Sequence, residues 1–196
     1  MPRNKILNDK NQIIDTALGI IATDGLEAVS MRRLSKEMGV SSMTLYNYVR
    51  NVDDIMHEIL VRSFNKLYEQ IYEFMREMAE NGDIGMKAYA KAYALALYDF
   101  ALKQTDICEY LIGQGKITFC HDAELRPFYD IFGIFLLNQA AGDGREQLKQ
   151  ICCLYEGAVT ALIHGHTTGV QPLSREDLTR MVDLFVEKMF PTNESE

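Results

Sequence analysis

Residues 30–51 read SMRRLSKEMGVSSMTLYNYVRN, and the apolar spacing within this stretch decides the fold of the region around it. Met31, Leu34 and Met38 recur at helical spacing and predict the buried face of one short helix. Gly39 follows directly and permits a sharp corner, after which Leu45 anchors a second short helix from behind. The pattern favours a helix-turn-helix, although an ordinary corner in any all-helical protein has the same spacing.

The outer side of the second helix carries small, polar and aromatic side chains. Packing through Leu45 leaves these residues free to project outward: Ser42, Met43, Thr44, Asn47 and Tyr48. Side chains of these kinds suit base edges and phosphates better than a protein core. The stretch therefore indicates DNA binding, with simple helix packing as the alternative.

Helical periodicity continues along the rest of the chain, and no strand alternation or internal repeat interrupts it. A helix is predicted after a cap at Asn8 or Asp9 and before Gly25, and further helices at 51–80, 86–104, 106–114, 122–141, 145–168 and 174–190. We therefore expect an all-α protein of about nine helices. Residues 1–52 would form a three-helix domain that contains the helix-turn-helix, and residues 53–196 a larger helical domain.

Composition places the chain in a broad class. Hydrophobic residues make up 47% of the 196 residues, which is enough for a sizeable core. The longest apolar runs fall far short of the roughly 20 residues needed to cross a bilayer, and the amino terminus lacks the apolar segment of a signal peptide. We expect a soluble cytoplasmic protein whose four cysteines are reduced.

Residues 12–60 resemble the amino-terminal domain of TetR-family transcriptional regulators. The most specific matches are GLEAVSMRRL at 25–34, MGV at 38–40 and LYNYV at 45–49, and NVDDIMHEIL at 51–60 opens the family's long connecting helix. The resemblance implies a DNA-binding set that comprises Arg32, Ser41, Ser42, Met43, Thr44, Tyr46, Asn47, Tyr48 and Arg50.

Two positions depart from the family pattern. Val52 stands where the family usually has a phosphate-binding lysine, and Arg50 is the candidate substitute. Met43 often corresponds to glycine or proline, and its side chain either contacts a thymine methyl or crowds the groove.

The formal net charge of -8 does not exclude a polyanionic partner, because the charge is unevenly distributed. Residues 1–60 carry a net charge of -1 and residues 61–196 a net charge of -7. Contact with phosphate depends on cations within a Debye length of roughly 8 Å. Arg32, Arg33, Lys36 and Arg50 are the candidates in the first segment.

The carboxyl-terminal third predicts a surface for self-association. Small residues recur at every fourth position of one helix, at Cys153, Gly157, Ala161 and Gly165, and such a row allows a second helix to approach closely. Close packing within the same subunit is the alternative. The resemblance implies a homodimer that binds a palindromic operator, and the predicted interface comprises Cys153, Gly157, Ala161, His164, Gly165, Met181 and Phe185.

The middle of the chain is rich in aromatic residues, which indicate either a well-packed core or an apolar pocket with a few polar groups. The resemblance implies a small-molecule effector that releases a repressor from DNA. The predicted effector-binding residues are His57, Tyr89, Tyr93, Tyr110, Phe128, Phe132 and Tyr155. Neither a cofactor nor a metal is expected.

Three other interpretations compete with this one. A metal or thiol-redox sensor on the same scaffold would use Cys120, His121, Cys152, Cys153, His164 and His166. No C-x-x-C or H-x-x-x-H spacing occurs among them. An enzyme is disfavoured because the chain has no glycine-rich phosphate loop and no nucleophile motif. A helical adaptor without DNA binding is suggested only by the missing lysine at Val52.

Overall fold

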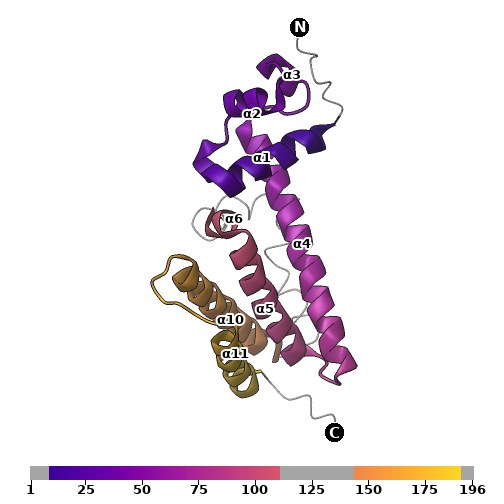
Figure 1. The fold of residues 1–196 in the computed structure, drawn as a ribbon. Helices are drawn as coiled ribbons and strands as arrows, with labels where there is room; N and C mark the ends of the chain where they lie inside the picture. Colours follow the sequence, from indigo (N-terminus) through magenta and orange to yellow (C-terminus); the bar gives the residue numbers. More distant parts are fainter. Residues whose placement is uncertain (1–8, 111–143, 191–196) are drawn as a thin grey trace. The chain divides into compact units, whose positions relative to one another are not determined.

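A computed structural model describes residues 9–110 and 144–190, and all regular elements in these two ranges are helices (Figure 1). In chain order they are α1 (Lys10–Asp24), the 3-10 helix η1 (Leu26–Ala28), α2 (Met31–Met38), α3 (Ser42–Tyr46), α4 (Val52–Glu80), α5 (Met86–Lys103), α6 (Thr105–Tyr110), α10 (Gly144–Thr167) and α11 (Arg175–Met189). The prediction of an all-α fold is confirmed. The helix expected at 122–141 lies outside the described residues.

The chain divides into two compact units, Met1–Phe64 and Asn65–Glu196. Helix α4 begins in the first unit and ends in the second, so the two units share one continuous helix. The predicted boundary between a DNA-binding domain of residues 1–52 and a second domain of residues 53–196 stays a prediction.

The core of the first unit is small and receives side chains from all four of its α-helices. Its fully buried members are Ile13, Ile14, Ala17, Leu34, Leu45, Ile55 and Ile59. Leu45 is the buried residue of α3, which confirms that this helix is anchored from behind. The side chains around Leu45 are therefore turned toward solvent.

Short polar side chains fix where α2 and α3 begin. Ser30 caps α2 by accepting a hydrogen bond from the backbone N–H of Arg33, and Ser41 caps α3 by accepting one from Thr44, both at 3.1 Å. Gly39 ends α2 with a left-handed φ of 68°, which a residue with a side chain adopts only with strain. The corner predicted at Gly39 is thus present.

In the second unit, α5 is a largely buried helix that packs against α6, α10 and α11. Two tyrosine hydroxyls fasten this packing. Tyr98 donates to the carbonyl of Leu173 at 2.8 Å, and Tyr155 donates to the carbonyl of Ala90 at 2.7 Å. The connection between α10 and α11 is closed further by His166, whose Nδ1 accepts from the backbone N–H of Leu173 at 2.9 Å. Across the described ranges, we find no helix with the length and apolar character of a membrane span.

Candidate nucleic-acid interface

Large side chains are exposed on the outer face of α3 and just past its end. Met43 is 74% exposed and Tyr46 is 52% exposed, and Tyr48 lies just past the helix at 37%. Leaving this much apolar surface in water is unfavourable, so a cluster of this kind marks an interaction site.

The hydroxyl groups at the start of α3 bind one another rather than pointing into solvent. Ser41 and Thr44 share a hydrogen bond between their hydroxyls at 2.8 Å, in addition to the capping bond. Ser42 donates to the Ser35 hydroxyl of α2 at 3.2 Å. The bond from Ser42 to Ser35 joins α3 to α2, while the bonds between Ser41 and Thr44 stabilise the start of α3. Met43, Tyr46, Asn47 and Tyr48 remain as exposed side chains.

The cations predicted from sequence fall into two groups. Arg32 and Lys36 are exposed on α2, in its first and last turns. Arg33 is already engaged, because its guanidinium lies 2.8 Å from Asp24 and 3.0 Å from Glu37. Arg33 is therefore a structural residue of the first unit, while Arg32 and Lys36 are available to a phosphate.

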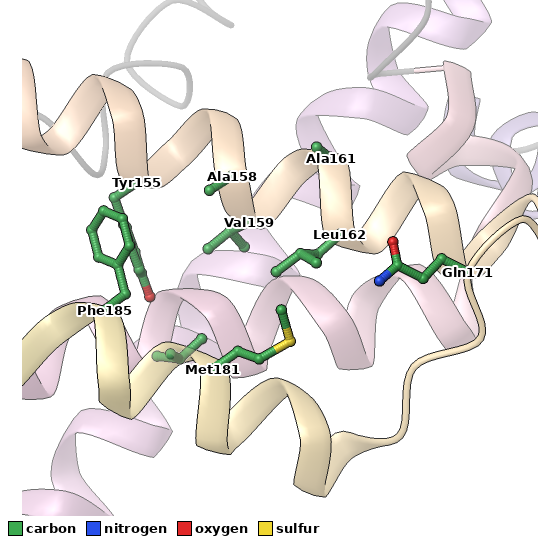
Figure 2. A pocket seen from close by; sticks show the side chains of 9 residues that line it. Tyr155, Ala158, Val159, Ala161, Leu162, Gln171, Met181 and Phe185 are labelled. Carbon is green, nitrogen blue, oxygen red and sulfur yellow. The ribbon is translucent and has the colours of Figure 1, made fainter.

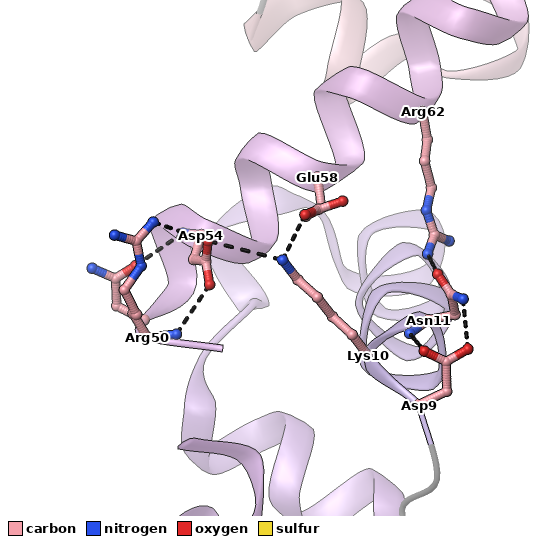
Figure 3. Close-up of polar contacts among 8 residues, drawn as sticks. Asp9, Lys10, Asn11, Arg50, Asp54, Glu58 and Arg62 are labelled. Carbon is pink, nitrogen blue, oxygen red and sulfur yellow. Dashed lines mark hydrogen bonds and ion pairs between the residues drawn. The ribbon is translucent and has the colours of Figure 1, made fainter. Parts of the chain in front are cut away.

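Arg50 lies immediately before α4 and is held there by Asp54 (Figure 3). The Asp54 carboxylate accepts the backbone N–H of Arg50 at 3.1 Å and its guanidinium at 3.4 Å. In return, the backbone N–H of Asp54 donates to the side-chain oxygen of Asn51 at 2.9 Å, so this turn is closed from both sides. The Arg50 side chain remains 88% exposed and presents a cation two residues before Val52.

The same figure shows how the start of α1 is joined to α4. Lys10 lies 2.5 Å from Glu58 and 4.0 Å from Asp54, and Arg62 donates a hydrogen bond to Asn11 (Figure 3). Arg62 also lies 2.9 Å from Asp15. Partial burial alone would raise the pKa of the Asp54 carboxyl, but the hydrogen bond from the Arg50 N–H and the charge of Lys10 outweigh it. The pKa of Asp54 is therefore below its ordinary value of 3.8.

Of the predicted effector residues, Tyr89 and Tyr155 lie close enough to Tyr93 for their phenols to influence it. Tyr89 and Tyr93 are buried on α5, and burial raises the pKa of both phenols above the ordinary 10.0. Tyr110 is half-buried at the end of α6, and His57 is half-buried within the first unit. Phe128 and Phe132 lie outside the described residues.

Tyr155, the remaining predicted effector residue, lines a groove between α10 and α11 (Figure 2). Its ring packs against Phe185 at 5.2 Å between centroids and against Phe190 at 5.7 Å. The groove has a volume of ≈ 380 Å³. It is lined by Tyr155, Ala158, Val159, Ala161, Leu162, Gln171, Met181, Val182 and Phe185.

The structure brings together three of the predicted self-association residues, Ala161, Met181 and Phe185, at this groove. Cys153 and Gly157 are exposed on the part of α10 that precedes Ala161. His164 is exposed but lies 2.8 Å from Glu109, and a Cβ on Gly165 would lie 3.4 Å from the Cβ of Gln171. These last two positions therefore make contacts within their own unit.

Sequence reasoning missed two of the most exposed apolar residues near this groove. Leu154 on α10 is 62% exposed and Leu184 on α11 is 61% exposed. Leu154 continues at helical spacing into Ala158 and Leu162, so a count of apolar residues on this neighbouring stripe would have found it.

Two of the described cysteines, Cys108 and Cys152, are unsuited to thiol chemistry. Burial raises the pKa of the Cys108 thiol to about 12 and that of Cys152 to about 11, so both are protonated and unreactive at neutral pH. Cys153 is exposed, and Cys120 and His121 lie outside the described residues. Within those described, no group of three or more His, Cys, Asp or Glu side chains is placed to hold a metal ion.

These features define a class of protein. A helix-turn-helix, whose second helix has a face exposed to solvent, is followed by a larger helical unit. Residues 13–59 match the model of the family described as "Bacterial regulatory proteins, tetR family". The match falls on the helix pair and the residues around it, the same stretch of the amino-terminal unit that carries the resemblance.

Individual relatives agree with this match. The chain is 34% identical over 94 residues to the uncharacterized HTH-type transcriptional regulator YobS of Bacillus subtilis, a match that covers 48% of this chain and 46% of that protein. It is 31% identical over 91 residues to the HTH-type transcriptional repressor DrrR1 of Streptomyces coeruleorubidus, covering 45% of this chain and 31% of that protein. The chain thus spans less than half the length of these two curated relatives.

The fold as a whole also has solved counterparts. The fatty acid degradation regulator FadR of Bacillus halodurans superimposes with a TM-score of 0.64 over 98% of this chain and 100% of its own. The two sequences are only 15% identical, so this likeness establishes a shared fold.

Replacing Asp54→Ala should lower the free energy of unfolding by about 1 kcal/mol, because it removes the acceptor for the Arg50 N–H and a neighbour of Lys10. Asp53→Ala is the matched control, since Asp53 is exposed in the same helical turn, and it should cost only a few tenths of a kcal/mol. Urea denaturation of the full chain, followed by circular dichroism, measures both.

The effect of Asp54→Ala should also depend on pH. A carboxyl with a lowered pKa stabilises the fold at neutral pH, and this stabilisation is lost as the pH falls through the lowered value. The difference between wild type and Asp54→Ala should therefore shrink when the pH is lowered from 7 toward 3. An undiminished difference at low pH would contradict this account of the carboxylate.

Proposed function

We propose that this chain is a transcriptional regulator that binds a palindromic DNA operator as a homodimer and is released from it by a small molecule. The observation that carries the proposal is the exposed face of α3, which is anchored by Leu45 in a stretch that matches the model of the TetR family. The relative DrrR1 is by name a transcriptional repressor, which favours repression over activation.

In this proposal α3 enters the major groove of the DNA. Met43 and Asn47 face the base edges, while the hydroxyl of Tyr46 binds a phosphate. Ser41, Ser42, Thr44 and Tyr48 contribute contacts at the rim of the groove or fix the helix in place. Arg32 and Arg50 supply cations on either side of α3.

The acidic bulk of the chain is compatible with this arrangement. Most of the net negative charge lies after residue 60, and the Debye length at physiological salt is roughly 8 Å. Charges farther from a phosphate than this distance are largely screened. Because few phosphates are neutralised by each subunit, we expect operator binding to be only moderately sensitive to salt.

A mobility-shift assay with DNA from the protein's own gene neighbourhood tests the central proposal. Wild type should bind a specific duplex, and Arg50→Ala should weaken binding roughly evenly across sequences. The slope of log K against log salt should fall by about 0.9 for each phosphate that the variant no longer neutralises. Arg76→Ala is the control, since Arg76 is an exposed arginine of the second unit. Failure to bind any duplex would overturn the proposed function.

Self-association is supported by the groove and its surroundings. Cys153, Gly157 and Ala161 offer small side chains over which a partner helix can approach, while Leu154 and Leu184 offer exposed apolar surface. A two-fold dimer formed through α10 and α11 would bury this surface. Symmetry would then repeat α3, and two such helices spaced about 34–36 Å apart fit successive major grooves.

Ala161→Glu should convert the dimer to a monomer, because it places a charge in the centre of the apolar groove. Leu102→Glu is the matched control, since Leu102 is an exposed apolar residue of α5 that does not line the groove. Sedimentation velocity at micromolar concentration distinguishes the two forms. A dimeric Ala161→Glu variant would show that the interface lies elsewhere.

The effector proposal is supported by the tyrosines of the second unit. Tyr89 and Tyr93 are buried close to one another on α5, and the charge interactions of Tyr93 extend to Glu156 and Cys108. An effector bound beside them, with Tyr110 and the predicted Phe128 and Phe132, would act on the part of α4 that belongs to the same unit. Since α4 continues into the first unit, a change in its course would reach α2 and α3.

Such a mechanism is a shift between two populations. The effector must bind the DNA-incompetent form more tightly, and each tenfold loss of operator affinity requires about 1.4 kcal/mol of differential binding.

A compound that lowers operator affinity in a fluorescence-polarisation assay should lose potency at least severalfold against Tyr93→Phe, which removes one of the few polar groups in a largely apolar site. Operator affinity without the compound should be unchanged. Tyr72→Phe is the control, because Tyr72 is 62% exposed on α4. Equal potency against wild type and Tyr93→Phe would place the effector elsewhere.

A further inference from the structure

We propose that α3 selects A·T base pairs, with Met43 against a thymine methyl group and Asn47 hydrogen-bonded to an adenine. This inference rests on the proposed DNA binding and adds the base class that the helix reads. It follows from which side chains of α3 are available and from what their chemistry can recognise.

The first step is the set of available side chains. The hydroxyls of Ser41, Ser42 and Thr44 are already bonded within the helix pair, at 3.2 Å or less. Each hydroxyl keeps part of its hydrogen-bonding capacity, but serine and threonine hydroxyls can bond to either kind of base pair and so set no preference between A·T and G·C. Met43 and Asn47 are exposed and lie four residues apart, so they share one face across the single turn of α3.

The second step is the chemistry of Met43. In the major groove guanine presents two acceptors and cytosine presents a donor, whereas thymine presents a methyl group beside its acceptor. The end of a methionine side chain is apolar and has no hydrogen to donate. Against a G·C pair it would strip water from polar groups without replacing their hydrogen bonds. Against thymine it gains an apolar contact.

The third step is what this stretch of sequence lacks. Residues 41–49 contain no arginine, lysine or glutamine, so α3 cannot make the bidentate arginine contact that most often selects guanine. Asn47 has the one amide in this stretch that matches the donor and acceptor of adenine. Arg32 and Lys36 belong to α2, and we assign them to phosphates. Both exposed readers of α3 therefore favour A·T pairs.

The test begins with selection of binding sites from random duplex DNA by the full-length protein. Within the selected half-site, each thymine is then replaced by deoxyuridine, which differs only by the absence of the methyl group. At one position this change should weaken wild-type binding by roughly fourfold, the effect expected for one methyl group removed from an apolar contact.

Met43→Ala should also bind the thymine site more weakly, and it should no longer distinguish thymine from deoxyuridine at that position. Ile84→Ala is the matched control, because Ile84 is an aliphatic residue of the second unit with the same exposed fraction of 74%. It should retain both wild-type affinity and the uracil effect. Asn47→Ala should relax the preference for one adenine by roughly tenfold.

The possible failures can be told apart. A selected half-site with G·C pairs at the positions that respond to Met43→Ala and Asn47→Ala would overturn this inference and leave DNA binding intact. The same holds if deoxyuridine has no effect at any thymine. If no sequence is enriched and no duplex is bound, the proposed function falls and this inference falls with it. Circular dichroism of each variant shows whether it is folded.

Discussion

The burial of Leu45 is the constraint on which the exposed surface of the first unit depends. Helix α3 has five residues, Ser42–Tyr46, and a helix this short is not stable by itself in water. The contacts that hold it in place include the fully buried Leu45 side chain, the cap from Ser41 and the hydrogen bond from Ser42 to Ser35 of α2. Because Leu45 is the buried side chain of α3, its exposed side chains are not required in the core and can serve a partner.

The two exposed surfaces of the chain differ in a way that fits two kinds of partner. Around α3, the exposed groups combine apolar, aromatic and amide side chains with nearby cations, a mixture suited to a base stack flanked by phosphates. Along α10 and α11 the exposed groups are small or aliphatic and border an apolar groove, which suits close helix packing. Exposing either surface to water is unfavourable, and a different association would remove each surface from water.

Local patterns predicted the parts of the structure that are decided locally. The corner at Gly39 and the long helix predicted at 51–80 depend on residues within a few positions of one another, and both are present. The all-α fold follows from the same periodicity.

Contacts that depend on distant parts of the chain were harder to predict. Arg33 was a candidate phosphate ligand, but the folded first unit places Asp24 within 2.8 Å of it. Tyr155 was grouped with the effector residues, and the structure places its ring at the groove against Phe185. Periodicity identifies the face on which a side chain lies but cannot identify what that face meets. The roles of all these candidate sites stay predictions.

The turn before α4 shows how an acidic chain can bind a phosphate and why specificity must then come from elsewhere. Val52 removes the cation that the family usually places there, and Arg50 stands in for it beside the carboxylate of Asp54. The backbone N–H of Arg50 holds that carboxylate in position, so the guanidinium can leave it without disturbing the turn. Moving the guanidinium from carboxylate to phosphate exchanges one charge-assisted hydrogen bond for another, and the net gain is small. With modest affinity from phosphates, discrimination between operators falls on Met43 and Asn47, the exposed side chains that chemistry directs to the bases.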